Sequence, residues 1–90
     1  MTSPLHITIW DYNLDRINIL ARNLHLAMGE RGIRGTISVM TERPLLARKN
    51  MYARAPVLEI DGKEWSLTPG KVPTQRDCLA LVCLLDEMGQ

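Results

Sequence analysis

Cysteine is scarce in this chain, which has only Cys78 and Cys83 and none before them. The two residues are five positions apart in a strongly helical stretch, so helix geometry separates their Cα atoms by roughly 8–9 Å and their directions by about 140°. A disulfide needs Cα atoms within about 7 Å of each other. We therefore expect no internal disulfide, and the spacing gives no better support for a metal site.

The chain also lacks an excess of either charge, because eleven Lys and Arg balance ten Asp and Glu to a net charge of +1. Nucleic-acid-binding domains usually carry a strong basic excess, so we expect no nucleic-acid partner. One local basic cluster comprises Arg43, Arg48, Lys49 and Arg54, beside Glu42. The favoured interpretation of this cluster is a solvated helix face followed by a loop.

Long hydrophobic runs are missing as well. No stretch approaches the ~20 apolar residues of a membrane span. The N-terminus has no basic opening or long apolar run of a signal peptide, because polar or charged residues interrupt it from Asp11 onward. The expected location is the cytoplasm, without a membrane partner.

Motifs for catalysis or cofactor binding are not found. His6 and His25 do not stand at metal-ligand spacing with other ligands. There is no phosphate-binding glycine loop, no Gly-x-Ser-x-Gly and no pair of carboxylates placed by spacing. We predict no metal site, no cofactor and no catalytic residue.

What the chain does have is hydrophobic content for a core, 46% over 90 residues, which predicts one domain spanning residues 1–90. The pattern predicts strands at 6–10, 36–40, 56–60 and 63–67, and helices over 14–31, after Thr41, and from Thr74 to about Met88. Asp61-Gly62 predicts a type I′ hairpin turn. The order βαβαββα predicts an α/β domain with a four-stranded mixed sheet and three helices.

Local signals support several of these boundaries. Gly32 is a good C-terminal cap for the first helix, and Thr74 with Asp77 partly matches a capping box. Thr41 is a candidate cap for the short helix, with Pro44 in its first turn. Apolar residues at three- and four-residue spacing define the core face of the first helix: Leu14, Ile17, Leu20, Ala21, Leu24 and Met28.

Three segments together resemble the small thioredoxin/glutaredoxin-like proteins. They are the strand HITIW at 6–10, Ala55-Pro56-Val57-Leu58 before Ile60-Asp61-Gly62-Lys63, and Gly70-Lys71-Val72-Pro73-Thr74. The resemblance covers essentially the whole chain and implies a minimal thioredoxin fold. It also implies that Pro56 follows a cis peptide bond and opens the third strand.

The redox-active Cys-x-x-Cys of that family is absent here. By position, Leu14-Asp15-Arg16-Ile17 replaces it at the start of the first helix. Disulfide exchange requires a thiolate, which leucine and isoleucine cannot provide. Cys78 shares a helical stripe with core residues and follows Asp77, so we expect a buried, inert thiol. The chain is therefore not expected to be a dithiol–disulfide oxidoreductase at the usual site.

The resemblance implies a groove beside Pro56 that holds an extended peptide or glutathione. If the preceding bond is cis, the backbone of Ala55 is expected to be unpaired at a sheet end. A ligand carboxylate there would meet Arg16 and the positive ends of two helices. Alternatively, Arg16 is an ordinary exposed residue and Tyr12 only covers the edge of the core. The candidate ligand-binding residues are Tyr12, Asn13, Arg16, Ala55, Pro56, Gly70 and Lys71.

A second candidate surface lies on the helices. Ile19 and Leu26 are about 180° from the core face of the first helix, and residues 78–85 of the last helix are apolar without a break. If both helices cover one face of the sheet, Ile19, Leu26, Leu79 and Cys83 form an interface patch. The alternative is that they are scattered exposed residues, which are common.

The sequence thus predicts a non-catalytic interaction module that binds a protein partner, or a second copy as a homodimer, through this apolar helix face. The alternative is a redox-associated protein that binds glutathione or a peptide in the groove beside Pro56.

Overall fold

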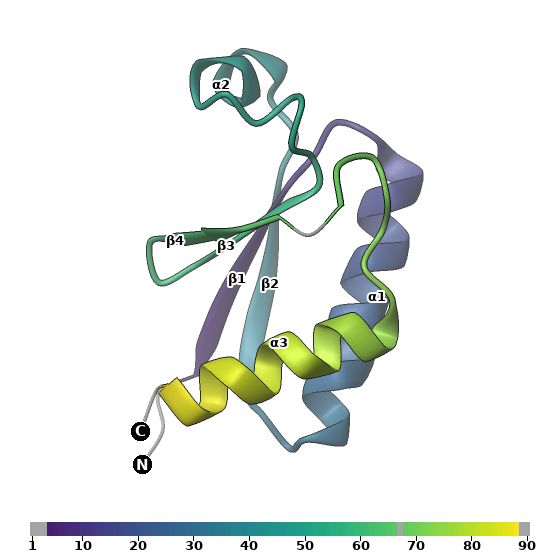
Figure 1. The fold of residues 1–90 in the computed structure, drawn as a ribbon, viewed down its shortest axis with the longest axis vertical. Helices are drawn as coiled ribbons and strands as arrows, with labels where there is room; N and C mark the ends of the chain where they lie inside the picture. Colours follow the sequence, from purple (N-terminus) through teal and green to yellow (C-terminus); the bar gives the residue numbers. More distant parts are fainter. Residues whose placement is uncertain (1–3, 67, 89–90) are drawn as a thin grey trace.

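The computed structural model describes residues 4–66 and 68–88, apart from the side chain of Met88. Within these residues the chain forms a four-stranded mixed sheet and three helices (Figure 1). The elements in chain order are β1 (Leu5–Trp10), α1 (Leu14–Glu30), β2 (Gly35–Met40), α2 (Arg43–Arg48), β3 (Val57–Ile60), β4 (Lys63–Trp65) and α3 (Gln75–Met88). The predicted order and the α/β class are confirmed.

The strands lie in the order β2-β1-β3-β4, so β1 is central and β2 and β4 form the edges. β1 and β2 are parallel, as a helical crossover requires, whereas β3 is antiparallel to both β1 and β4. Trp10 at the end of β1 lies opposite Met40 in β2 and Val57 in β3. The chain therefore leaves β1 and enters β3 at the same end of the sheet.

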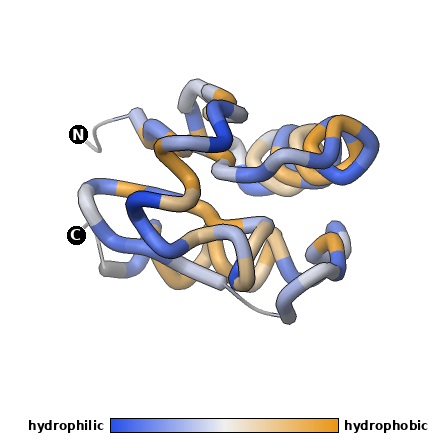
Figure 2. Tube along the Cα trace, turned by 90° about the horizontal axis from the view of Figure 1, so that it is seen from above, coloured by the Kyte–Doolittle hydropathy of each residue, from blue (hydrophilic) through white to orange (hydrophobic). Residues whose placement is uncertain are grey.

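One face of the sheet is covered by α1 and α3, which pack against each other on the same side (Figure 1). Ile7 and Ile9 from β1 and Leu58 and Ile60 from β3 point into this layer because alternate strand residues share a face. Seen from above, α1 carries both hydrophilic and hydrophobic residues around its turns (Figure 2), as expected for a helix that packs on one side. The helix residues of this core are Ile17, Leu20, Leu24, Ala27, Met28, Cys78, Val82 and Leu85.

Among the described residues, helix α2 covers the opposite face of the sheet at one end. There α2 packs Leu46 against Trp10, Val57 and the buried Met51 in a second, smaller hydrophobic cluster. Farther along the strands this face is polar, with His6 hydrogen-bonded to Thr36 at 2.7 Å. The alternation of apolar and polar residues along β1 thus produces one face that is buried in the core and one that is largely polar.

The turn and cap signals of the sequence have clear counterparts. Asp61 and Gly62 have φ values of 52° and 80°, the two positive values of a type I′ turn. Thr74 and Asp77 form the expected reciprocal capping box, at 3.0 and 3.1 Å. Gly32 follows α1 with φ 66°, where Ile33 N donates to Met28 O at 2.8 Å and Gly32 N donates to Gly29 O at 3.2 Å. These bonds identify a Schellman motif.

Three details differ from the sequence-based expectations. Leu14 is 68% exposed instead of belonging to the core face, because it is the first residue of α1 and lies beyond the edge of the sheet layer. Glu42, not Thr41, is the N-cap of α2, and its side chain makes no capping hydrogen bond. β4 ends at Trp65, whereas residue 67, the predicted end of the strand, is outside the described residues.

None of the helices in the described ranges is long and apolar enough to cross a membrane.

Candidate functional site

The end of the sheet where β1 stops and β3 starts brings together three loops. Because Trp10 pairs with Val57, Asp11 and Pro56 lie next to each other just beyond the paired residues. The Ala55–Pro56 peptide bond is cis. Gly70, with φ 78°, donates its N–H to the Ala55 carbonyl at 2.8 Å. We call this region, with Tyr12, Asn13, Leu14 and Tyr52 around it, the candidate site.

The hydrogen bond from Gly70 corrects one expectation. The backbone of Ala55 was expected to be unpaired, but its carbonyl oxygen is taken by the loop before α3. The same loop is fixed from α1, since Asn23 Nδ2 donates to Pro73 O at 2.8 Å. This loop therefore closes one side of the candidate site and leaves less free backbone there than the sequence suggested.

Asp11 is the central polar group of the candidate site, and it is completely buried. Its Oδ1 accepts hydrogen bonds from the backbone N–H groups of Tyr12 at 2.7 Å and Asn13 at 3.2 Å. Arg16 donates to the same carboxylate from Nε at 2.9 Å and Nη2 at 2.8 Å. Four donors thus compensate the burial of one negative charge, as a buried carboxylate requires.

Sequence analysis did not identify Asp11 as a site residue. The available signal was its position directly after an apolar strand, five residues before an arginine in the first turn of a helix. That spacing lets the arginine fold back over the loop before the helix, where its guanidinium binds both oxygens of the Asp11 carboxylate.

Arg16 is consequently turned inward, and its side chain is only 18% exposed. The hydrogen bonds to Asp11, and secondarily the interaction with Tyr12, raise the pKa of Arg16 above its ordinary value. Its Nε and Nη2 bind Asp11, so the alternative that Arg16 is an ordinary exposed residue is wrong. Arg16 holds the loop before α1 in place, and contact of a ligand carboxylate with it stays a prediction.

Asn13 serves as the N-cap of α1, with its Oδ1 accepting a hydrogen bond from Arg16 N at 3.0 Å. A side-chain oxygen at this position satisfies one of the free N–H groups of the first turn. The described contacts of Asn13 are therefore those of a structural cap.

Tyr12 packs between aromatic and cationic groups. Its ring centroid lies 5.0 Å from that of Tyr52, and the Arg16 and Arg43 guanidinium carbons lie 5.1 and 5.9 Å from its centroid. Tyr12 is half-buried, whereas Tyr52 is 36% exposed. The pair links the β1–α1 loop to the segment after α2 and presents an aromatic surface flanked by positive charge.

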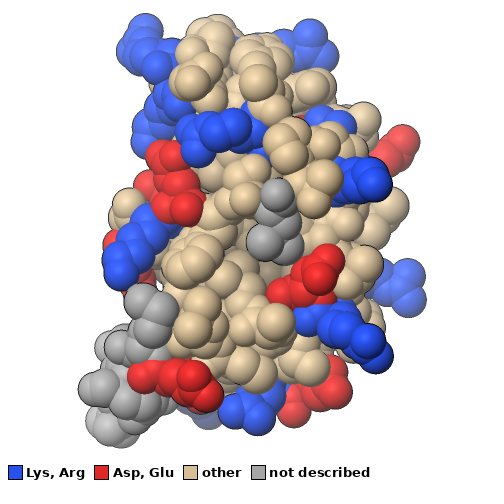
Figure 3. All heavy atoms as spheres, viewed as in Figure 1, with Lys and Arg blue, Asp and Glu red and all other residues tan. Residues whose placement is uncertain are grey.

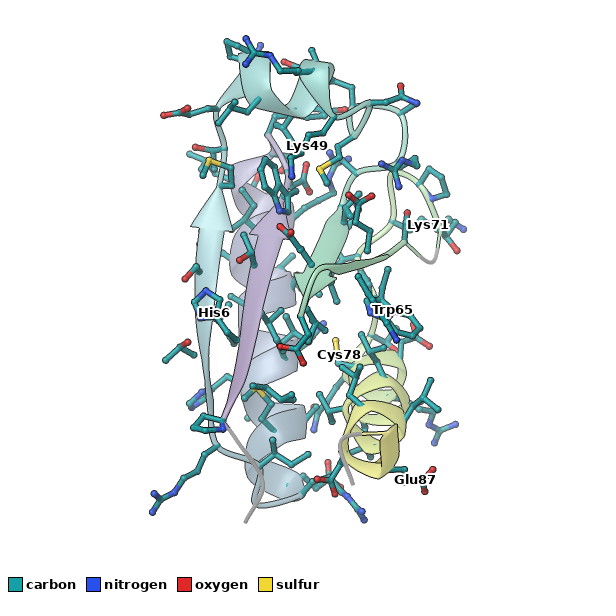
Figure 4. The ribbon with its side chains drawn as sticks, turned by 90° about the vertical axis from the view of Figure 1, so that its left-hand side faces the viewer. His6, Lys49, Trp65, Lys71, Cys78 and Glu87 are labelled. Atoms are coloured by element: carbon teal, nitrogen blue, oxygen red, sulfur yellow. The ribbon has the colours of Figure 1, made fainter. Side chains whose placement is uncertain are left out.

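Lysines and arginines gather around the α2 end of the molecule (Figure 3). Lys49 Nζ lies 4.8 Å from the centroid of the Trp10 ring, while Trp10 Nε1 donates to Glu59 at 2.8 Å. Lys71, next to Gly70, is exposed at the same end of the sheet (Figure 4). The candidate site is therefore bordered by exposed cations, and its own carboxylate is neutralised by Arg16.

The first turn of α1 presents no sulfur. Leu14 is 68% exposed and Ile17 is 4% exposed, so the position nearest solvent carries an apolar side chain. Cys78 faces the core between α3 and the sheet (Figure 4) and is 1% exposed. Burial, aided by Asp77, raises the pKa of Cys78 to about 11. Cys78 is therefore buried, as expected, and its raised pKa disfavours the thiolate form.

The helix-face candidates are only partly exposed. Ile19 is 52% exposed and Leu26 is 41% exposed, as predicted. Leu79 and Cys83 are half-buried, and Leu79 packs against the main core. Leu84 is an exposed large residue of α3, at 44%. The structure thus gives the predicted patch less exposed apolar area on α3 than the sequence indicated.

No protein-family model, curated protein or solved structure matches this chain. The described residues also include no group of three His, Cys, Asp or Glu side chains arranged to hold a metal ion.

Proposed function

We propose that this chain is a thioredoxin-like domain that acts by binding rather than by thiol chemistry. The order of the elements and the strand order β2-β1-β3-β4 support a thioredoxin-like fold. The exposed Leu14 and the buried Ile17 stand where such a fold would carry its two reactive cysteines. A leucine at the solvent-facing position offers a contact for an apolar side chain instead of a nucleophile.

The ligand that suits this end of the sheet is a short acidic peptide, of which glutathione is a small representative. The observation that carries this proposal is the exposed Tyr52 ring beside Tyr12, with the Arg43 guanidinium also near the Tyr12 ring. Leu14, Lys49 and Lys71 are exposed in the segments that meet at this end of the sheet. Apolar and aromatic groups supply contact area, and cations attract carboxylates. Asp11 does not repel such a ligand, because Arg16 neutralises it within the protein.

NMR titration tests the proposal directly. We expect glutathione, or an acidic hexapeptide, to shift the amide signals of Tyr12, Tyr52, Gly70 and Lys71 in a saturable manner. The Tyr52→Ala variant should weaken these shifts, whereas Ile19→Ala, on the outer side of α1, should leave them unchanged. Unshifted spectra at about 10 mM of both ligands, where even a millimolar Kd gives near-saturation, would refute it.

The exposed fractions of Ile19 and Leu26 favour a second candidate function, the docking of a protein partner on the outer side of α1. These residues are two helical turns apart on the same side of α1, with Arg22 and Asn23 on the turn between them, so they offer two separate apolar contacts. An apolar dye such as ANS should bind at these contacts and lose much of its fluorescence with Ile19→Glu. Equal dye fluorescence for the variant and the original chain would eliminate this candidate.

A further inference from the structure

The two edges of the sheet are protected very differently. β4 is three residues long and carries Lys63 and Glu64, and short charged strands resist pairing with other chains. β2 is six residues long, Gly35–Met40, and contains no charged residue and no proline. It forms the free border of the sheet in Figure 4, with no described helix beyond it. This edge is therefore competent to accept another strand.

The direction of the free backbone groups follows from the pairing with β1. Leu5 N donates to Arg34 O at 2.9 Å, and Asp11 N donates to Met40 O at 3.3 Å. Successive residues of a strand direct their N–H and C=O groups to opposite sides. Even-numbered residues of β2 therefore face β1, whereas Gly35, Ile37 and Val39 direct their backbone groups away from the sheet.

We propose that two copies of this chain pair through β2, antiparallel, about a two-fold axis at Ile37. In this register Ile37 lies opposite Ile37 of the second copy, and Gly35 lies opposite its Val39. Each of these residues exchanges both backbone hydrogen bonds with the opposing residue. The two sheets then become one continuous sheet, and the contact is self-complementary, as a two-fold dimer requires.

Side-chain sizes fit this register. Val39 is 45% exposed, and its side chain lies on the same sheet face as that of Ile37. A hollow of about 390 Å³ lies beside Gly35, lined by the apolar Met28, Ile33 and Ile37 and also by His25, Gly29 and Arg34. Directly opposed residues have Cβ positions about 4.5–5.5 Å apart. Val39 of the second copy, directly opposite Gly35 and on the same sheet face, therefore covers this hollow with an apolar side chain.

Charges at the two ends of β2 also favour the antiparallel arrangement. Arg34 immediately precedes the strand, and Glu42 follows it by two residues; both are exposed. Neither forms an ion pair within the described part of the chain. The proposed register places Arg34 opposite Met40 of the second copy and diagonally next to its Glu42, within reach of long side chains. A parallel arrangement would place like charges at the same end.

Light scattering during size-exclusion chromatography tests the dimer. Two copies of the 10.2 kDa chain should elute together at about 100 µM, whereas Val39→Lys should elute as a monomer with an unchanged circular dichroism spectrum. Leu84→Lys is the matched control, because it adds the same charge at an equally exposed apolar residue on α3. A monomeric original chain, or a dimer that survives Val39→Lys, would overturn the proposal.

The charge pair tests the register. Arg34→Glu and Glu42→Arg should each weaken the dimer, by roughly two- to thirtyfold, because each change affects two symmetric pairs. The double variant Arg34→Glu/Glu42→Arg should restore the dimer.

In hydrogen exchange, the amides of Gly35, Ile37 and Val39 should be protected in the dimer and exposed in Val39→Lys. Failure of the double variant to recover, or unprotected amides in the dimer, would overturn the register. None of these readouts involves the peptide site.

Discussion

Arg16 binds both carboxylate oxygens of Asp11, which is completely buried at the end of β1. The arginine comes from the first turn of α1, so this pair connects the sheet to the helix across the loop of Tyr12 and Asn13. The loop N–H groups bind the same carboxylate. The geometry of the candidate site therefore depends on one internal ion pair.

Removal of the arginine should destabilise the protein strongly. In Arg16→Gln the buried carboxylate of Asp11 loses its counter-charge, and breaking such a pair typically costs about 3–5 kcal/mol. Glu64→Gln is the control, because it removes the charge of the Arg54–Glu64 pair, whose side chains are 38% and 35% exposed, and leaves the bonds of Arg54 to the Asn50 and Lys49 carbonyls intact. Surface pairs of this kind contribute under about 1 kcal/mol. Urea denaturation should separate the two variants; similar losses would contradict the importance of the buried pair.

Cys78 should make the folded protein less stable in alkaline solution. Its pKa is raised from 9.0 to about 11 in the folded chain, so the folded state holds the thiol proton more firmly than the unfolded state. The free energy of unfolding should then fall as pH rises from 9 to 11, by roughly 2–3 kcal/mol in total. Cys78→Ala should lack this component, while the control Cys83→Ala should retain it. Identical alkaline profiles for the two variants would contradict the prediction.

Gly35 and Gly29 should respond in opposite directions to alanine. A Cβ at Gly35 would lie 2.5 Å from the Leu5 carbonyl oxygen and from Met28 Cε, so Gly35→Ala should destabilise by about 1–3 kcal/mol. A Cβ at Gly29, within α1, would meet nothing within 4 Å. Gly29→Ala should stabilise by up to about 1 kcal/mol, because alanine has the higher helix propensity. Thermal unfolding measures the stability of both variants. Equal changes in stability would contradict the close approach of Leu5 and Met28 to Gly35.

Installing cysteines tests the proposed relationship to thioredoxin-like proteins. Residues three apart in a helix have Cα atoms about 5 Å from each other, within the range of a disulfide. Leu14→Cys/Ile17→Cys should therefore form an internal disulfide and accelerate the reduction of insulin by dithiothreitol. The original chain and Leu14→Cys alone should not. An inactive double variant that nevertheless folds and forms its disulfide would argue against the relationship.

Much of the fold could be predicted because local signals and hydrophobic alternation act in the same direction. Asp61-Gly62 gives both positive φ values of a hairpin turn, and Thr74 with Asp77 caps α3. The alternation in β1 separates the core face from the polar face correctly. These features depend on neighbouring residues, so a single sequence contains them.

The candidate site was less predictable because it depends on contacts between distant segments. Burial of Asp11 requires Arg16 to fold back over the loop, and the Ala55 carbonyl is occupied only because Gly70 reaches it from another loop. Leu14 fits the helical periodicity of the core face but lies beyond the end of the sheet. Periodicity gives the direction of a side chain, not whether another element is there to cover it.

The two tryptophans lie on opposite faces of the sheet. Trp10 belongs to the cluster under α2, with Lys49 over its ring, whereas Trp65 packs against the main core on the side of α1 and α3. The variants Trp10→Phe and Trp65→Phe each leave a single tryptophan, so the fluorescence of the two residues can be measured separately. The emission of Trp10 reports what happens next to Lys49, and that of Trp65 reports the integrity of the helical layer. The chain in this way contains separate optical probes for the surface under α2 and for unfolding of the helical layer.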